Sequence, residues 1–154
     1  MSPQSKPVRK RPARGVLQVS GQSTVVFLTV CTRDRNRWLV RPGVHEMVRK
    51  AWERAAAWRV GNYLLMPDHV HLFCTPHQSD VKLNEWVRFW KSMTTRLHGR
   101  SDWRWQSLHW DTRLRSGKQF TEKWRYVQNN PVRAGLVESP ENWPHQGKVH
   151  TIRW

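Results

Sequence analysis

The sequence contains two strand-like runs that are separated by only two residues. Val60 to Met66 and His69 to Thr75 are rich in β-branched, aromatic and aliphatic residues, and Pro67 and Asp68 lie between them. So short a connection indicates an antiparallel hairpin with a tight or bulged turn. A fold for this chain must therefore contain this hairpin as part of an antiparallel sheet.

Segments with helical periodicity lie on both sides of the hairpin. Apolar residues recur at three- and four-residue steps from Val44 to Trp58 and again from Leu83 to Leu97, which gives each segment one buried stripe. Ser79 or Asp80 is expected to cap the second helix, and Gly99 is expected to end it.

Two more strands and a third helix complete the expected order. The run TVVFLTVCT at residues 24–32 is typical of a central strand, and Trp103 to Leu114 alternates like a strand. A third helix is expected from Lys118 to Asn130, stopped by Pro131, with Gly135 ending a short turn beyond it. The order β-α-β-β-α-β-α predicts an α+β domain, ferredoxin-like or RNA-recognition-like, with the helices packed on one face of an antiparallel sheet.

The chain carries a large positive charge. Its 154 residues include 27 Lys and Arg against 11 Asp and Glu, for a formal net charge of +16. Residues 1–15 hold five of the basic residues and no acid, so the remainder still carries +11. We predict that residues 1–15 form a disordered basic arm and that residues 16–154 form a single domain.

Such a charge is typical of a protein that binds a polyanion, and nucleic acid is the leading partner. The eleven Trp residues would let some aromatic rings stack on unpaired bases, although most are expected to pack in the core. A ribosome-associated basic protein and a membrane-surface protein remain alternatives on composition alone.

Two further features bear on where the protein works. Cys31 and Cys74 belong to no CxxC pair, so the sequence indicates neither a disulfide framework nor a zinc ribbon and fits a reducing cytoplasm. No apolar run approaches the ~18 to 20 residues that cross a bilayer, so neither a membrane anchor nor a membrane partner is expected.

Two histidines of the second hairpin strand form the first candidate site. The period of two puts His69 and His71 on the same face, where two imidazoles make half a metal site. Two surface histidines on an edge strand would give the same pattern. A closed zinc site that adds Cys74 and His77 is disfavoured, because Cys74 should face the opposite side of the strand.

The third helix holds a second set of polar residues. The 100° step per residue places Lys123, Tyr126 and Asn130 on one face beside the buried stripe. One helix could thus supply a tyrosine nucleophile and, four residues later, an amide oxygen as metal ligand. Its lysine would lie near a substrate phosphate that the tyrosine attacks. The alternative is that Tyr126 packs against the core and Asn130 ends the helix before Pro131.

The two sets together resemble a known family. YLLMPDHVHLF, followed after about fifty residues by YVQNNPVRAGLV, resembles the REP-associated tyrosine transposases, a branch of the single-tyrosine HUH transposases. The resemblance extends over residues 24–145 and includes WKSMTTR, WQSLHWDTRLRS and a Trp-Pro pair at Trp143. The chain departs from the family pattern where His109 and Trp110 precede Asp111, and in its Trp-rich central segment, so no catalytic role is assigned there.

The resemblance implies an activity and a set of roles. His69 and His71 match the histidines of the HUH motif, Tyr126 matches the nucleophile, and Asn130 falls where a third, amide-type ligand is expected. By this resemblance, residues 16–154 would be a catalytic domain that uses Mg²⁺ or Mn²⁺. It would cleave and transfer single-stranded DNA beside a hairpin, through a 5′-phosphotyrosine intermediate.

The sequence leaves other interpretations open. A non-catalytic relative that binds hairpin DNA or structured RNA is the main alternative, and a replication-initiator or relaxase-type HUH nuclease is a further one. We favour a monomer over a dimer. Six basic residues are candidate DNA contacts: Lys91, Arg96, Arg113, Arg115, Lys123 and Arg133.

Overall fold

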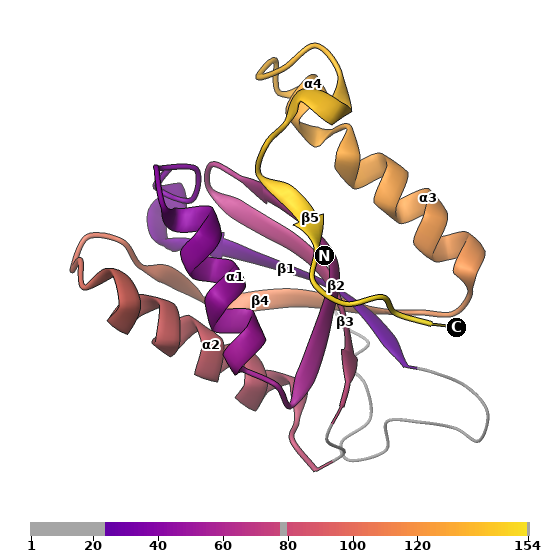
Figure 1. Ribbon diagram of the computed structural model, residues 1–154, viewed down its shortest axis with the longest axis horizontal. Coiled ribbons are helices and arrows are strands. Elements are labelled where there is room, and N and C mark those ends of the chain that lie inside the picture. The colour runs from indigo at the N-terminus through magenta and orange to yellow at the C-terminus, as the bar shows by residue number, and fades with distance from the viewer. Residues whose placement is uncertain (1–23, 78–79, 154) are drawn as a thin grey trace, which may run out of the picture.

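The computed structural model describes residues 24–77 and 80–153 (Figure 1). The expected basic arm and the possible cap Ser79 lie outside these residues. The elements in chain order are β1 Val25–Thr32, the 3₁₀ helix η1 Arg33–Arg35, α1 Val44–Arg54, β2 Trp58–Met66, β3 His69–Pro76, α2 Leu83–His98, β4 Trp105–Leu114, α3 Gly117–Gln128, α4 Asn130–Arg133, the 3₁₀ helix η2 Pro140–Asn142 and β5 Gln146–Lys148.

The strands form one antiparallel sheet in the order β4-β1-β3-β2-β5. β2 and β3 make the expected hairpin, with Met66 paired to His69 across the Pro67 and Asp68 turn. The order of β4, β1, β3 and β2, with α1 after β1 and α2 after β3, is that of a ferredoxin-like unit. The predicted α+β class with an antiparallel sheet is therefore confirmed.

β5 is a strand that the sequence pattern missed. It pairs with the edge of β2 through residues Gln146 to Lys148, which carry no apolar side chain. Gly147 lies against Tyr63 of β2, where an added Cβ would stand 2.8 Å from the Tyr63 hydroxyl oxygen. A glycine at this position therefore allows the short edge strand to approach β2.

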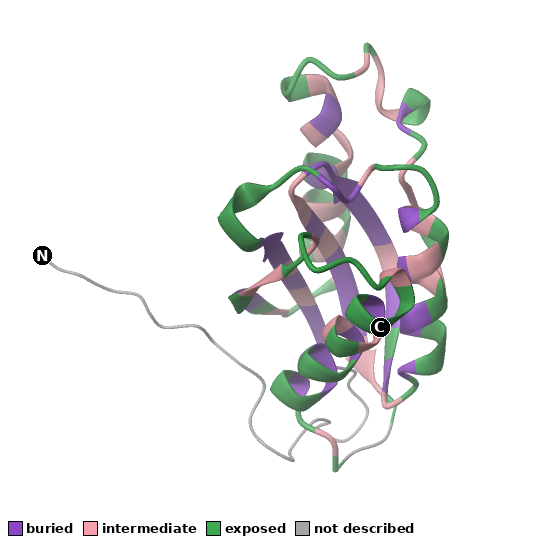
Figure 2. Ribbon diagram, turned by 90° about the vertical axis from the view of Figure 1, so that its left-hand side faces the viewer, coloured by how far each residue is buried: buried purple, intermediate pink, exposed green. Residues whose placement is uncertain are grey.

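The helices are divided between the two faces of the sheet, which corrects the expectation that they all pack on one. α1 and α2 cover one face, where Leu28, Val70, Leu72 and the tryptophans of α1 and α2 form the main core (Figures 1 and 2). α3 packs on the opposite face, where its apolar residues meet β1, β2 and β3. Both faces of the central strands are buried, which explains why β1 reads as a continuous apolar run.

The helix ends differ from the expected ones by a few residues. α1 ends at Arg54, and Trp58 already belongs to β2. Lys82, rather than Asp80, precedes α2, and Gly99 ends that helix with a left-handed φ of 64°, as expected. α3 ends at Gln128 and the chain continues into α4, which accommodates Pro131 in its first turn. No helix in residues 24–77 and 80–153 is long and apolar enough to cross a membrane.

Candidate active site

The two histidines of β3 lie side by side on the face of the sheet that α3 covers. Their ring centres are 4.8 Å apart, and the planes are nearly perpendicular. The residues that alternate with them, Val70 and Leu72, are fully buried on the other face against α1 and α2. Because β3 is held by this core, the two imidazoles project from a rigid strand.

Each ring is oriented by a hydrogen bond to its Nδ1 atom. The Nδ1 of His69 donates to the Asp68 carboxylate over 2.8 Å, and Asp68 in turn accepts from Arg35 over 3.0 Å. The Nδ1 of His71 and the hydroxyl of Thr29 on β1 share a hydrogen bond of 2.9 Å. These bonds leave Nε2 of both rings for a ligand, which is the arrangement that metal-binding histidines commonly have.

Both rings are held in the neutral form. Burial lowers the pKa of His71 to about 3, aided by the positive charges of neighbouring Lys123 and Arg133 and by His69. Burial also lowers the pKa of His69, against the opposing effect of Asp68. Neutral imidazole is the form that coordinates a metal ion, so neither ring must first lose a proton at neutral pH.

α3 is tied to the histidines through Phe27 of β1. The His71 ring stacks on Phe27 with centres 5.3 Å apart, and the ammonium of Lys123 lies 5.2 Å from the Phe27 ring centre. The apolar side of α3 packs beside them through Trp124 and Val127. The helix that carries Tyr126 therefore crosses the same face of the sheet as the histidine pair.

Tyr126 is 60% exposed and lines a groove of about 410 Å³ between α3 and the end of β4. Within the described part of the chain, no hydrogen bond or ring contact joins it to either histidine. The guanidinium of Arg133 lies 3.9 Å from the centre of the tyrosine ring and donates to the Tyr126 backbone carbonyl over 2.9 Å. A positive charge thus stands beside the tyrosine ring.

Asn130 begins α4 instead of ending α3, and it lies four residues after Tyr126. Its side-chain oxygen, the expected third ligand atom, accepts a hydrogen bond from Arg133. Residues 24–77 and 80–153 contain no group of three or more His, Cys, Asp or Glu side chains that could hold a metal. The histidine pair would therefore need an amide oxygen or water to complete a coordination shell.

The structure argues against the zinc-site alternative. Cys74 is fully buried in the core beneath α1 and α2, on the face opposite to His69 and His71. His109 and Asp111 are also on that side, buried in β4 with 3.4 Å between Nε2 and Oδ2. None of these three side chains lies on the face that carries the histidine pair.

The predicted DNA contacts fall into separate groups. Arg113, Arg115 and Lys123 line the groove of Tyr126, and Arg133 lies on its ring. Arg96 is exposed on α2. Lys91 is turned toward β4, where its ammonium donates to the carbonyl of Gln106 over 2.8 Å.

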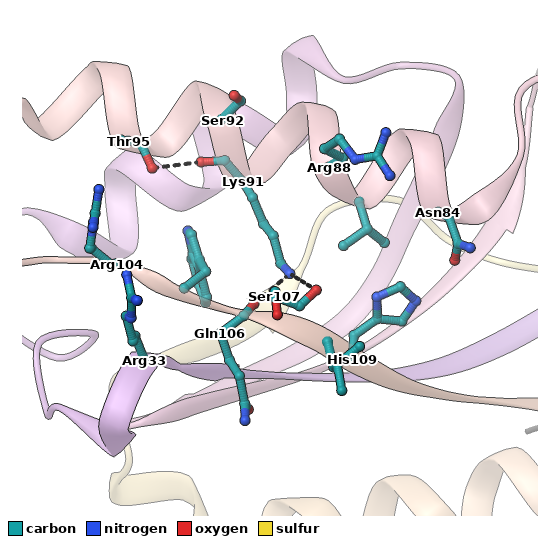
Figure 3. Close-up of a pocket in the computed structure, with 13 residues that line it drawn as sticks. Arg33, Asn84, Arg88, Lys91, Ser92, Thr95, Arg104, Gln106, Ser107 and His109 are labelled. Atoms are coloured by element: carbon teal, nitrogen blue, oxygen red, sulfur yellow. Dashed lines mark hydrogen bonds between the residues drawn. The ribbon is translucent and has the colours of Figure 1, made fainter. Parts of the chain in front are cut away.

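Lys91 belongs to a second groove of about 580 Å³ between α2 and β4 (Figure 3). Burial lowers the pKa of Lys91 to about 8, with Arg88 adding repulsion. The groove also contains Arg33 and Arg104, and no acidic residue is among those that line it. The sequence did not single out these three arginines, because they come from separate segments that only the fold brings together. A surface of this charge and shape suits a phosphate backbone.

The fold and the site define an α+β domain with paired neutral histidines and a tyrosine-bearing helix on one face of a basic sheet. The REP-associated tyrosine transposase of Escherichia coli K12 is 26% identical over 121 residues, which cover 77% of this chain and 72% of that protein. A Haemophilus influenzae Rd protein provisionally assigned to the same family is 24% identical over 135 residues, covering 77% of this chain and 76% of its own length. No protein-family model matches the chain.

A solved structure of a REP-associated tyrosine transposase bound to a REP hairpin has the same fold. Its TM-score is 0.71 at 22% identity, and the match covers 95% of this chain and 82% of that one. The resemblance seen in the motifs is thus confirmed: the sequence of this chain is similar to two REP-associated tyrosine transposases, and its fold is similar to that of a REP-associated tyrosine transposase of solved structure.

Proposed function

We propose that this protein is a metal-dependent strand transferase that cleaves single-stranded DNA beside a hairpin through a 5′-phosphotyrosine. The observation that carries the proposal is the pair of neutral imidazoles, each held at Nδ1 and left free at Nε2, on the sheet face crossed by the helix of Tyr126. The relationship to transposases agrees with this chemistry.

The residues present fit a divalent metal. His69 and His71 would supply two nitrogen ligands, and Asn130 or water would supply oxygen once Arg133 releases the amide. Mn²⁺ accepts such a mixed set readily and Mg²⁺ accepts it less well. When bound, the metal would act as a Lewis acid that offsets negative charge on the scissile phosphate.

Tyr126 supplies the nucleophile in the proposed reaction. Its phenolic oxygen bonds to phosphorus while the proton leaves to solvent, and the bond from phosphorus to the 3′-oxygen breaks. The departing oxygen takes up a proton and becomes a free 3′-hydroxyl. Attack by another 3′-hydroxyl on the phosphotyrosine restores Tyr126 and joins the new strands, so no external energy source is needed. Arg133, whose guanidinium lies over the Tyr126 ring, would hold the tyrosine in position for this attack.

Hairpin DNA is the proposed partner. The structural relative is bound to a REP hairpin, and both grooves beside β4 in this chain are lined by cations. Their arginines and lysines would neutralise phosphates and release counterions. The protein is proposed to act as a monomer, in which the histidine pair and Tyr126 of one chain serve the same site.

The test is incubation of the protein with 5′- and 3′-labelled hairpin oligonucleotides and Mn²⁺, followed by a denaturing gel. Wild type should give a protein-linked DNA band, and Tyr126→Phe should give none. Tyr63→Phe is the matched control, because Tyr63 is the other of the two tyrosines in the chain and is buried between α1 and β5. It should retain the band.

Two results would contradict the proposal. A band that persists in Tyr126→Phe would exclude this tyrosine as the nucleophile. Tight hairpin binding without any covalent product, across a broad hairpin library and with either metal, would favour the non-catalytic binding protein instead.

A further inference from the structure

Trp110 differs from the other tryptophans of the protein. Of the ten tryptophans that the structure describes, it is the most exposed, with 50% of its surface open to solvent. Each of the other nine contacts another aromatic ring or a histidine, for example Trp86 with Trp90, whereas no ring contact involves Trp110 in the described residues. The indole also belongs to none of the hydrophobic clusters of the described residues.

The direction of the side chain follows from the alternation along β4. The residues on either side of Trp110, His109 and Asp111, are buried on the face that α2 covers. Because successive side chains of a strand point to opposite faces, the indole projects on the face that carries the histidine pair.

The register of the sheet places Trp110 level with the histidines. Trp110 pairs with Thr29 of β1, and Thr29 pairs with His71 of β3 and hydrogen-bonds its ring. Two interstrand spacings of ~4.8 Å put the backbones of Trp110 and His71 about 10 Å apart. An extended strand whose phosphate lay at the histidines would therefore pass close to the indole.

Trp110 also lies beside the groove of Tyr126 along β4. Thr112, two residues farther along β4 and on the same face, lines that groove together with Lys123 and Tyr126. Leu108, two residues before Trp110, is 65% exposed and lines the groove of Lys91, so Trp110 lies on β4 between residues of the two basic grooves. A basic groove leading to an exposed aromatic ring is the combination that binds single-stranded nucleic acid.

We propose that Trp110 forms a stacking site for one unpaired nucleobase, next to the phosphate held at the histidine pair. The inference rests on the proposed function, since it takes the strand at the histidines to be DNA. Stacking requires an unpaired base, because the faces of paired bases within a stem are already covered. Trp110 would position the strand, and Tyr126 would react with it.

The test is a binding experiment in the Tyr126→Phe background, so that no covalent product forms. The probe is the DNA hairpin that this parent binds most tightly from a pool with randomised unpaired flanks. Fluorescence anisotropy compares it with the same stem lacking flanks and with copies that carry a single abasic site at each flank position. Trp110→Ala should weaken binding of the flanked hairpin by roughly 5- to 150-fold and leave the flankless stem unchanged.

Two matched variants and one abasic probe complete the design. Trp110→Phe should keep most of the affinity, since a smaller ring still stacks. Phe89→Ala, which removes an exposed aromatic ring on α2, should bind like the parent. At one flank position, an abasic site should lower the affinity of the parent to that of Trp110→Ala for the intact hairpin. The same abasic site should cause no further loss of affinity in Trp110→Ala.

The outcomes separate the two proposals. Unchanged affinity of Trp110→Ala for the flanked hairpin would overturn the stacking site while leaving the proposed function intact. An equal loss on the flankless stem would overturn it as well, because the effect would not depend on an unpaired base. A parent that binds no hairpin of the pool would refute the proposed function and with it the stacking site.

Discussion

Replacement of Thr29 by valine tests how the site holds His71. Valine keeps the shape of threonine and removes the hydroxyl that bonds to Nδ1 of His71 over 2.9 Å. In the wild type this bond fixes the orientation of the His71 ring, with Nδ1 directed at Thr29 and Nε2 left for a metal. Loss of such an outer partner typically lowers metal affinity 10- to 100-fold, or about 1.4 to 2.7 kcal/mol.

The assay is titration of the DNA-free protein with Mn²⁺, with free Mn²⁺ measured by its electron paramagnetic resonance signal. Thr75→Val is the matched control, because Thr75 is on the same strand and face as His71 and also uses its hydroxyl in a hydrogen bond, to the Thr24 carbonyl over 2.6 Å. Thr29→Val should bind Mn²⁺ more weakly than both wild type and Thr75→Val.

The same variant should also lose some stability. The Nδ1 atom of His71 would be left without its partner in a mostly buried position, at about 1 to 3 kcal/mol in the free energy of unfolding. Urea titration of the metal-free protein measures this loss. If Thr29→Val bound Mn²⁺ as tightly as the wild type, the role given to this hydrogen bond would be refuted. An equal loss of Mn²⁺ affinity in Thr75→Val would show that the effect is not specific to the bond with His71.

Three further predictions concern the core, the thiols and the basic groove. Trp86 is 1% exposed, and its indole donates to the Ala55 carbonyl over 2.7 Å. Trp86→Ala should therefore lower the free energy of unfolding, measured by urea titration, by about 3 to 5 kcal/mol. A loss below ~1 kcal/mol would contradict the packing described. Burial raises the pKa of both Cys31 and Cys74, so a thiol reagent at pH 8 should label them only after unfolding, and rapid labelling of the native protein would argue against that burial. If Arg113, which lines the groove of Tyr126, contacts a phosphate, Arg113→Ala should make the dependence of log K for hairpin binding on log salt concentration shallower by about one. An unchanged slope would show that Arg113 is not part of the DNA interface.

Most of the fold was predictable because its signals are local. The hairpin follows from two strand-like runs around Pro67 and Asp68, and the helices follow from their apolar periods. The position of α3 was not predictable in this way. An amphipathic helix indicates that one of its sides is buried, but not which face of a sheet it meets. β5 escaped because Gln146 to Lys148 pair through backbone atoms and leave no pattern in the side chains.

In the candidate site, too, the local features were predictable and the contacts between distant segments were not. The period of two places His69 and His71 on one face, and their partner Asp68 is adjacent in the chain. Thr29 is 42 residues away from His71, and only the register between β1 and β3 reveals the pair. The arginines that surround Lys91 likewise belong to separate segments, so their common groove could not be inferred from any single motif.

One face of the sheet holds the main core, and the other carries the polar site. This division explains how a small domain can support a polar site. The core lies mainly beneath α1 and α2, where it holds β3 through Val70 and Leu72 and so determines the geometry of the histidine pair on the opposite face. The position of Tyr126 depends on α3, which lies outside the main core. Val127 is the buried residue of α3, and the other apolar residues of this helix are only partly covered. The histidines are therefore positioned by the main core, whereas the distance from them to the tyrosine is determined by how one amphipathic helix packs on the sheet.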